Sequence, residues 1–263
     1  MSFTDTQKCK ESYEYGENKA NRLNDYWSKV IKKCGTEVTN NSYYRFVHKF
    51  NKGGRRYLHQ AYSKVNGFVS EIIYHPEWGR PAKVTNGNSV VSYSYDKGGM
   101  IASKKEPTKT TQYVYKNACN KVSALRVDYF SRLPSSKSKG KFVKKLAKTV
   151  TTNYKYSADK KCNLKVAKSS TGQYVSLNYD INGRIKSIVD QTKKQLRIQY
   201  DPSLGRPSLI ERPGLGALRV RYNADGSVRE AKSPQGPTVA AQVAGIFSNF
   251  LELIGPAASE LSI

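Results

Sequence analysis

The stretch 177–229 repeats one short pattern, and this repeat restricts the fold more than any other feature of the chain. In each copy an apolar residue, a polar residue and a Tyr lead into Asp or Asn, then into a turn that ends in Gly. Self-similarity at a period of roughly 20–50 residues indicates a repeat architecture. The copies are defined by Tyr179, Asp180 and Gly183, by Tyr200, Asp201 and Gly205, and by Tyr222, Asn223 and Gly226.

The repeated unit has the pattern of a β-hairpin. Leu177 and Tyr179 alternate with Asn178, so the apolar side chains share one face of a strand. The pair Asn182-Gly183 then supplies the positive φ angles that a tight turn needs. We therefore expect an outgoing strand, a turn and a returning strand in every copy.

This pattern resembles the YD repeat of the RHS family, whose copies read roughly Y-D-x-x-G-R-[LI]. The sequence YDINGRI at 179–185 matches at every named position, whereas the copy at Tyr95, Asp96 and Gly99 has no Arg. The family includes bacterial RHS elements, insecticidal toxin-complex components and animal teneurins. The resemblance implies a spiralling antiparallel sheet and says less about activity. Some larger members carry a self-cleaving aspartate motif, which residues 201–205 do not match.

Repeat positions can be followed through most of the chain. From Phe50 the Tyr position recurs at Tyr74, Tyr95, Tyr115, Tyr156, Tyr179, Tyr200 and Tyr222, and one interval, 115–156, is double. The sequence therefore predicts an all-β body over 44–237, built from YD-repeat antiparallel hairpins in a curved or spiral sheet. Many Tyr residues would then face the core.

Segments at both ends show helical spacing. Over 17–33, Leu23, Tyr26, Trp27, Val30 and Ile31 predict an amphipathic helix, so we expect a helical cap at 1–43. Residues 238–263 follow a Pro-Gly breaker and begin with an apolar helical pattern. We expect this second helix to cover the last hairpins.

The chain is strongly basic, with 45 Lys and Arg against 20 Asp and Glu and a net charge of +25. Such a surface attracts polyanions. The most basic stretch is an expected insertion at 131–149, where Phe142, Leu146 and Val150 recur like one side of a short helix. It either binds an anionic membrane or polymer, or is a solvated loop. The candidate polyanion-binding residues are Arg132, Lys137, Lys139, Lys141, Lys144, Lys145 and Lys148.

Four cysteines, Cys9, Cys34, Cys119 and Cys162, lack C-x-x-C spacing, which leaves free thiols or two disulfides. A Cys9–Cys34 bridge would pin the N-terminal helix. We expect Cys119 and Cys162 to be joined if the basic stretch is looped out. With a whole hairpin between them, their turns would lie roughly 20 Å apart, too far for a bond.

The expected compartment depends on this chemistry. The first residues lack the pattern of a signal peptide, so we expect a removed signal and a secreted, periplasmic or cell-surface protein, with a cytoplasmic protein as the alternative. No transmembrane segment is expected, because no apolar run reaches the length of a membrane span.

The residues that catalysis would need are sparse. His48, His59 and His75 form no H-E-x-x-H pattern, no G-x-S-x-G motif is present, and turn chemistry explains the repeat aspartates. We therefore expect no enzyme and no cofactor. The leading hypothesis is an envelope-associated or secreted binding module for an anionic polysaccharide, lipopolysaccharide or membrane surface. The alternative is a structural scaffold of a secreted assembly or toxin-delivery system, with protein partners. Nucleic acid would be favoured only by exposed Tyr interleaved with Lys and Arg.

Overall fold

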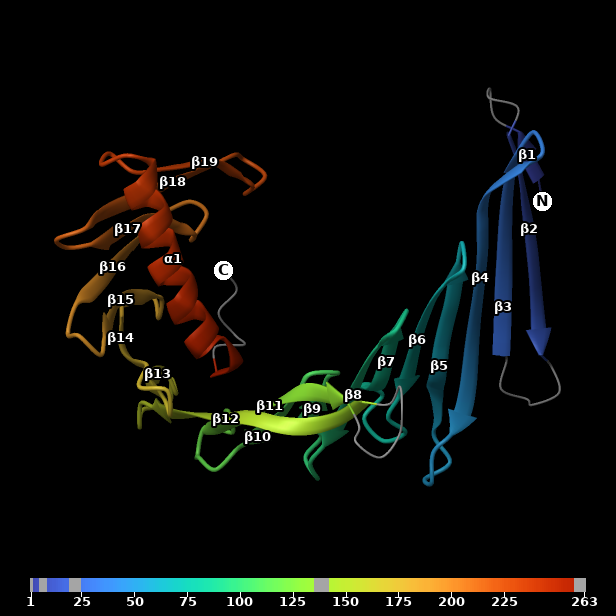
Figure 1. The fold of residues 1–263 in the computed structure, drawn as a ribbon, viewed down its shortest axis with the longest axis horizontal. Helices are drawn as coiled ribbons and strands as arrows, with labels where there is room; N and C mark the ends of the chain where they lie inside the picture. Colours follow the sequence, from blue (N-terminus) through green and yellow to red (C-terminus); the bar gives the residue numbers. More distant parts are fainter. Residues whose placement is uncertain (1, 5–8, 19–24, 135–141, 258–263) are drawn as a thin grey trace. The chain divides into compact units, whose positions relative to one another are not determined.

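In the computed structural model, the described residues are 2–4, 9–18, 25–134 and 142–257. They form an antiparallel β fold in which each strand pairs with the next along the chain, followed by one α-helix and a 3-10 turn (Figure 1). The strands are β1 Ser2–Thr4, β2 Cys9–Asn18, β3 Asp25–Cys34, β4 Glu37–Phe50, β5 Arg56–Val65, β6 Phe68–Tyr74, β7 Pro81–Asn86, β8 Ser89–Tyr95, β9 Ile101–Lys105, β10 Lys109–Val114, β11 Ala124–Pro134, β12 Phe142–Tyr156, β13 Leu164–Ser169, β14 Tyr174–Tyr179, β15 Ile185–Asp190, β16 Gln195–Tyr200, β17 Pro207–Arg212, β18 Gly216–Tyr222 and β19 Val228–Lys232. The helices are α1 Pro237–Ile254 and η2 Gly255–Ala257. The predicted all-β hairpin class is confirmed.

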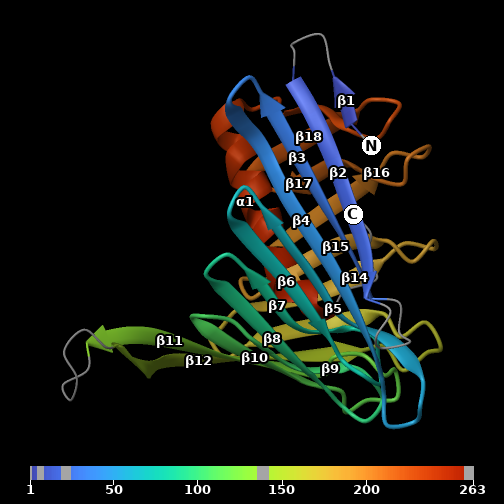
Figure 2. The same cartoon turned by 90° about the vertical axis from the view of Figure 1, so that its right-hand side faces the viewer.

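The chain divides into two compact units. Unit 1 comprises 1–111 with 130–132, and unit 2 comprises 112–129 with 133–263. Within unit 1, the strands β2 to β9 lie side by side in sequence order (Figure 2). The three-part division at residues 43 and 237 stays a prediction.

Each well-formed repeat hairpin is irregular at one place. The strand register shifts immediately before the repeat tyrosine, between Asn178 and Tyr179 and between Gln199 and Tyr200. The same shift precedes Tyr95 and Tyr222. A β-bulge bends its strand and redirects a side chain. The sequence repeat is therefore also a repeat of backbone geometry.

The prediction of a helix over 17–33 is wrong for the described residues of that range. Residues 25–34 form β3, in which Tyr26, Ser28 and Val30 alternate with Trp27, Lys29 and Ile31. The aromatic and β-branched residues that suggested a helical stripe also suit a strand with both faces partly exposed. Residues 19–24, including Leu23, lie outside the described residues. The Cys9–Cys34 bridge is present, and it joins two directly opposed strand residues with a Cα–Cα distance of 4.1 Å.

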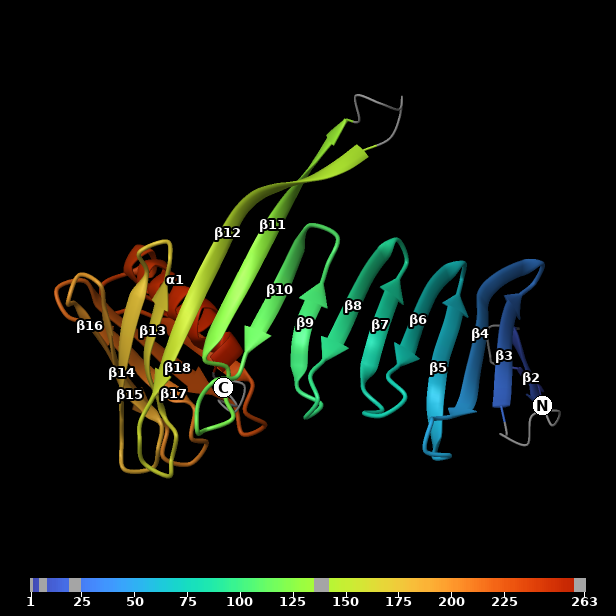
Figure 3. The ribbon, with the colours of Figure 1, turned by 90° about the horizontal axis from the view of Figure 1, so that it is seen from below.

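The expected helix and loop at 131–149 are also wrong in their described part. Phe142–Tyr156 is the long strand β12, which runs past the ends of β13 and β14 in Figure 3. The apolar residues that recur every four positions fall on one face of a strand as well as of a helix. Together β11 and β12 form an inserted hairpin, so the double interval contains a further repeat-like unit.

The bond between Cys119 and Cys162 is confirmed, although the looped-out topology behind it is wrong. The β11–β12 hairpin stands between the two turns, and the Cα atoms are still 5.8 Å apart. Two intervening strands separate such turns by about 10 Å, not 20 Å. The connections 115–123 and 157–163 can close that shorter gap.

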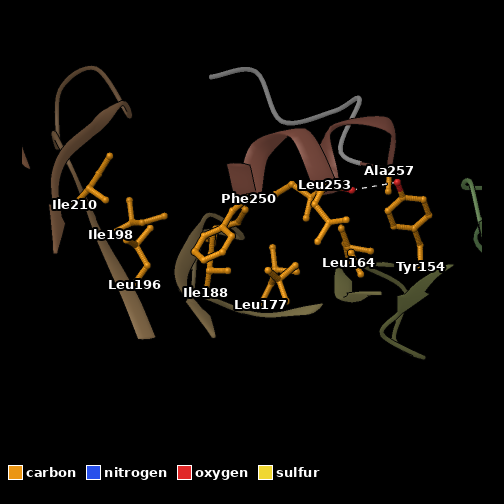
Figure 4. Close-up of a cluster of buried hydrophobic side chains, with 14 of the residues drawn as sticks. Tyr154, Leu164, Leu177, Ile188, Leu196, Ile198, Ile210, Phe250, Leu253 and Ala257 are labelled. Carbon is orange, nitrogen blue, oxygen red and sulfur yellow. Dashed lines mark hydrogen bonds between the residues drawn. The ribbon is translucent and has the colours of Figure 1, made fainter. Parts of the chain in front are cut away.

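Unit 2 has an apolar core between its sheet and α1. Leu177, Ile188 and Leu196 on the sheet are almost completely buried (Figure 4). Val243 and Ile254 on the helix are buried as well. The hydroxyl of Tyr154 donates a 3.1 Å hydrogen bond to the Leu253 carbonyl. The C-terminal helix thus packs against the last hairpins, as the sequence predicts (Figure 1).

The expectation that no segment could span a membrane requires correction. By length and composition, the 21 residues Pro237–Ala257 are long and apolar enough to cross one, alone among the helices of the described residues. Their apolar side packs in the core of unit 2. This packing accounts for the composition, because a core helix and a membrane helix share it.

Candidate functional surfaces

The repeat aspartates are held in their turns by backbone hydrogen bonds. Asp180 accepts bonds from the N–H groups of Asn182 and Arg184, at 2.9 and 2.8 Å. Asp96 and Asp201 accept equivalent bonds in their own turns. Gly183 completes the turn at φ 80°, where a side chain would be strained. These carboxylates shape turns, as the sequence predicts.

The repeat tyrosines join each hairpin to the one before it. The hydroxyl of Tyr200, at the end of β16, donates a 2.9 Å hydrogen bond to the carbonyl of Ile185, at the start of β15. Tyr179 bonds Leu164 in the same way, and Tyr222 bonds Pro207. Burial raises the pKa of Tyr179 and of Tyr200 to about 12. The tyrosines therefore have a structural role in the repeat.

The basic residue after the turn Gly also reaches the next hairpin. The Arg184 guanidinium lies over the Tyr200 ring, and Arg206 lies over Tyr222. Arg206 also donates to the Gly226 carbonyl, and Arg80 donates to Gly99 at 2.7 Å. Several of the 45 Lys and Arg thus make contacts within the repeat and do not act as free surface charge.

A charged pair is buried at the edge of the unit 2 sheet that lies opposite the turns of the repeat aspartates. Arg212 donates to the Asp190 carboxylate, and both side chains are about 8% exposed. Burial acts to raise the pKa of Asp190, but hydrogen bonds from Thr192 and Arg212 outweigh it, so the pKa is lowered from its ordinary value. The pair fixes two strands beside α1.

The histidines do not converge on a metal or a nucleophile. His48 donates its backbone N–H to Asp25 at 2.7 Å, and His59 lies beside Tyr57. Burial lowers the pKa of both imidazoles. No group of three or more His, Cys, Asp or Glu side chains gathers within the described part of the chain.

The candidate polyanion-binding residues are only partly described. Lys137, Lys139 and Lys141 lie outside the described residues, and Arg132 is placed only as part of β11. Lys144, Lys145 and Lys148 are exposed on β12, and Lys148 lies 5.0 Å from the Tyr129 ring centroid. Exposed Val143 and Leu146 stand among them. The structure thus groups three of the seven on one strand.

A second basic surface lies on the outer face of unit 2, away from α1. Arg219, Arg221 and Arg229 line a shallow hollow of about 540 Å³ over β16 to β19. Arg221 lies 3.9 Å from Glu230, whereas Arg219 forms no ion pair with a described residue. Sequence analysis missed this cluster, because its members lie on two paired strands and not in one charge run.

One face of the unit 1 sheet carries a set of large apolar side chains with serines between them, and we call it the apolar face. Register places on it Tyr26 opposite Phe46, with ring centroids 4.7 Å apart, and Ile72 opposite Val84. Among the described residues of unit 1 no helix covers this face. Its members include Tyr15, Tyr26, Tyr44, Phe46, Phe68, Ile72, Val84, Val91 and Tyr93.

The apolar face corresponds to the helix-covered face of unit 2. Tyr95, a repeat tyrosine, follows Val91 and Tyr93 on it at strand spacing. In unit 2 the repeat tyrosines Tyr179 and Tyr200 pack against the core that α1 completes. In unit 1 the exposed fractions are 66% for Tyr15, 46% for Tyr26 and 56% for Phe68. The same repeat face is thus filled in one unit and open in the other.

No family model matches the chain, and no curated protein does. Among solved structures it is similar to the Photorhabdus luminescens Tc holotoxin pore, with 11% identity, a TM-score of 0.33, and coverage of 87% of this chain and 16% of that one. A TcdB2–TccC3–Cdc42 structure gives 10% identity, a TM-score of 0.33, and coverage of 87% and 18%. A porin-like protein from Bacteroides uniformis gives 14% identity, a TM-score of 0.26, and coverage of 87% and 90%. The chain thus spans less than a fifth of the length of these toxin chains.

Proposed function

We propose that this protein is a non-enzymatic scaffold that binds a protein partner through the apolar face of unit 1. The observation that carries the proposal is the contrast between the two units. One repeat face is covered by α1 in unit 2, and its counterpart in unit 1 leaves Tyr15, Tyr26 and Phe68 about half or more exposed. Large apolar side chains exposed on one sheet face mark a candidate interaction site.

The occupant is an amphipathic helix of another protein with acidic residues beside its apolar stripe. The helical form follows from unit 2, where α1 fills the equivalent face with Val243, Phe250 and Ile254. The acidic flanks follow from the net charge of +25, which also disfavours a second copy of this chain. The assembly is extracytoplasmic, since the bonds Cys9–Cys34 and Cys119–Cys162 suit an oxidising compartment.

Site-specific photo-crosslinking tests this function. A photoreactive aromatic residue replaces Phe68 on the apolar face or, as control, Val90, which is 39% exposed on the opposite face. We expect one protein to crosslink at 68 and not at 90, and the purified partner to bind the full chain. Equal crosslinking from both positions, or a crosslinked protein that does not bind when purified, contradicts the proposal.

An anionic partner is the second candidate function. The hollow lined by Arg219, Arg221 and Arg229 favours it, together with the exposed lysines of β12. Acidic glycans, lipopolysaccharide or anionic vesicles would bind there with an affinity that falls steeply as salt rises. The replacement Arg219→Gln should weaken such binding at least threefold at low salt, whereas Gln195→Ala on the same face should not. An affinity that changes neither with salt nor with Arg219→Gln excludes this site.

A further inference from the structure

The second face of the unit 1 sheet alternates aromatic and basic side chains. In one row across the strands, Trp27 stands opposite Arg45, and Arg45 stands opposite Tyr62. Directly opposed residues of an antiparallel pair share a face, so ring and charge alternate across three strands. In the next row the order is reversed. The aromatic-basic face comprises Trp27, Lys29, Tyr43, Arg45, Tyr62 and Lys64.

The rings of this face form a stepped row. The Trp27 and Tyr43 centroids are 6.1 Å apart, and so are those of Tyr43 and Tyr62, with interplanar angles of 31° and 62°. The indole of Trp27 lies across Gly16 of β2, where an added Cβ would come within 2.6 Å of its nitrogen. Gly16 therefore lets the indole lie against the strand.

The charge on this face is mainly positive. Glu14 is paired with Lys29 at 3.4 Å, and Glu71 accepts a hydrogen bond from Gln60. Lys64 is exposed next to Tyr43, and the guanidinium carbon of Arg45 lies 6.0 Å from the Tyr62 ring centroid. Register continues the face to two further lysines, Lys83 and Lys105. A polyanion crossing the strands would thus meet basic side chains along its path.

We propose that the aromatic-basic face binds a single-stranded nucleic acid. A nucleic-acid strand alternates flat bases with charged phosphates, as this face alternates rings with cations. The ring spacing exceeds the roughly 3.4 Å per nucleotide of a duplex strand, so the bases must be unstacked, which only a single strand permits. Aromatic residues on a sheet stack such bases with little sequence preference. The site does not depend on the partner proposed for the apolar face.

Fluorescence anisotropy of the oxidised full chain tests the ligand class. The probes are a labelled 15-nucleotide oligo(dT), a duplex of the same length, and alginate as an acidic polysaccharide competitor. We expect oligo(dT) to bind at least tenfold more tightly than duplex and to resist displacement by alginate. In a Trp78→Phe background, Trp27 is the remaining tryptophan, and stacking should quench its fluorescence.

Adjacent residues on opposite faces provide the matched variants. Tyr43→Leu removes a ring from the aromatic-basic face, and Tyr44→Leu removes one from the apolar face of the same strand. We expect Tyr43→Leu to weaken oligo(dT) binding from about fivefold to about a hundredfold, as loss of base stacking does, and Tyr44→Leu to change it less than twofold. Thermal melts establish that both variants fold.

Three outcomes would overturn the proposal. The first is equal loss of oligo(dT) binding in Tyr43→Leu and Tyr44→Leu. The second is alginate binding that matches oligo(dT) in affinity and in sensitivity to Tyr43→Leu, which would make the face a polysaccharide site. The third is the absence of oligo(dT) binding to a folded, oxidised chain. Tyr62→Leu should repeat the effect of Tyr43→Leu, because its ring belongs to the same row.

Discussion

The guanidinium of Arg184 lies over the ring of Tyr200, 4.7 Å from its centroid, while the same group pairs with Asp180 at 2.8 Å. One side chain thus closes its own turn and holds the tyrosine of the next hairpin. Burial acts to raise the pKa of Asp180, but hydrogen bonds from Arg184 and its charge lower it below the ordinary value. The repeat motif is therefore a coupling between neighbouring hairpins as well as a turn signal.

Replacement of Arg184 by Gln should lower the free energy of unfolding by about 1–2 kcal/mol. The change removes a partly exposed ion pair and a cation–π contact, each modest alone. Chemical denaturation measures it, with Lys186→Gln as the control, because Lys186 is exposed and has no polar partner among the described residues. An equal loss of unfolding free energy in Arg184→Gln and Lys186→Gln would refute the coupling of neighbouring hairpins through Arg184.

Replacement of Tyr200 by Phe should cost about 1 kcal/mol, because it removes the hydrogen bond to the Ile185 carbonyl and leaves the ring in place. Tyr174→Phe is the matched control, since the Tyr174 hydroxyl has no hydrogen-bond partner among the described residues. Thermal or urea unfolding of both variants checks the difference. A neutral Tyr200→Phe would show that the hydroxyl ladder does not stabilise the sheet.

Alkaline pH should destabilise unit 2 when its partly buried repeat tyrosines ionise. The pKa of Tyr179 and Tyr200 is raised to about 12, so their stabilisation is complete below the ordinary value of 10.0 and is lost as pH rises through about 12. Ultraviolet titration of tyrosinate and circular dichroism should show that these tyrosines ionise at the same pH at which the β structure is lost. Ionisation of all tyrosines near pH 10 with the fold intact would contradict this.

Acid should weaken the pair formed by Asp190 and Arg212. The pKa of Asp190 is lowered in the fold, so its contribution is present above the ordinary value of 3.8 and is lost as pH falls through the folded value. Arg212→Met should cost about 3–5 kcal/mol near pH 7, because it leaves a buried carboxylate unpaired. The cost should shrink as pH falls and Asp190 takes up a proton in the variant. If the loss of unfolding free energy in Arg212→Met did not change with pH, the charge of the pair would not be what stabilises the fold.

The disulfide between Cys119 and Cys162 should stabilise unit 2 by about 4 kcal/mol in the chain-entropy account, given the sequence separation of 43. Cys119→Ser with Cys162→Ser tests this in guanidinium unfolding, and the pair Cys9→Ser with Cys34→Ser is the matched control that affects unit 1. Non-reducing peptide mapping checks the connectivity. Free thiols at 119 and 162 in protein from an oxidising compartment would refute the bond.

Sequence reasoning succeeded where a residue's role is local. Turn Asp and Gly, hairpin alternation and the Tyr period all follow from neighbouring residues, so the all-β hairpin fold was predictable. It failed for Tyr26, Trp27 and Val30, because aromatic and β-branched residues at short spacing fit a helix or a strand, and pairing with β2 and β4 decides. The arginine hollow of β16 to β19 was hidden for a similar reason, since only the pairing of β18 with β19 brings Arg229 to the hollow that Arg219 and Arg221 line.

The candidate surfaces depend on the same register. Tyr43 and Tyr44 are adjacent in sequence and point to opposite faces, so composition alone cannot assign either to a core or to a ligand. The prediction that repeat tyrosines face inward is confirmed for Tyr179 and Tyr200. It does not extend to Tyr43 and Tyr62, which are interleaved with Arg45 and Lys64 on the other face.

The measurement that tests the scaffold function most directly is the affinity of the purified crosslinked partner for the oxidised full chain, by titration calorimetry. Phe68→Ser and Val69→Ser are compared, because these neighbours on β6 lie on the apolar face and the opposite face. We expect Phe68→Ser to weaken binding by about tenfold to a hundredfold, as loss of a buried Phe contact does, and Val69→Ser to change it less than twofold. Equal effects of the two variants, or none from Phe68→Ser, would contradict the account.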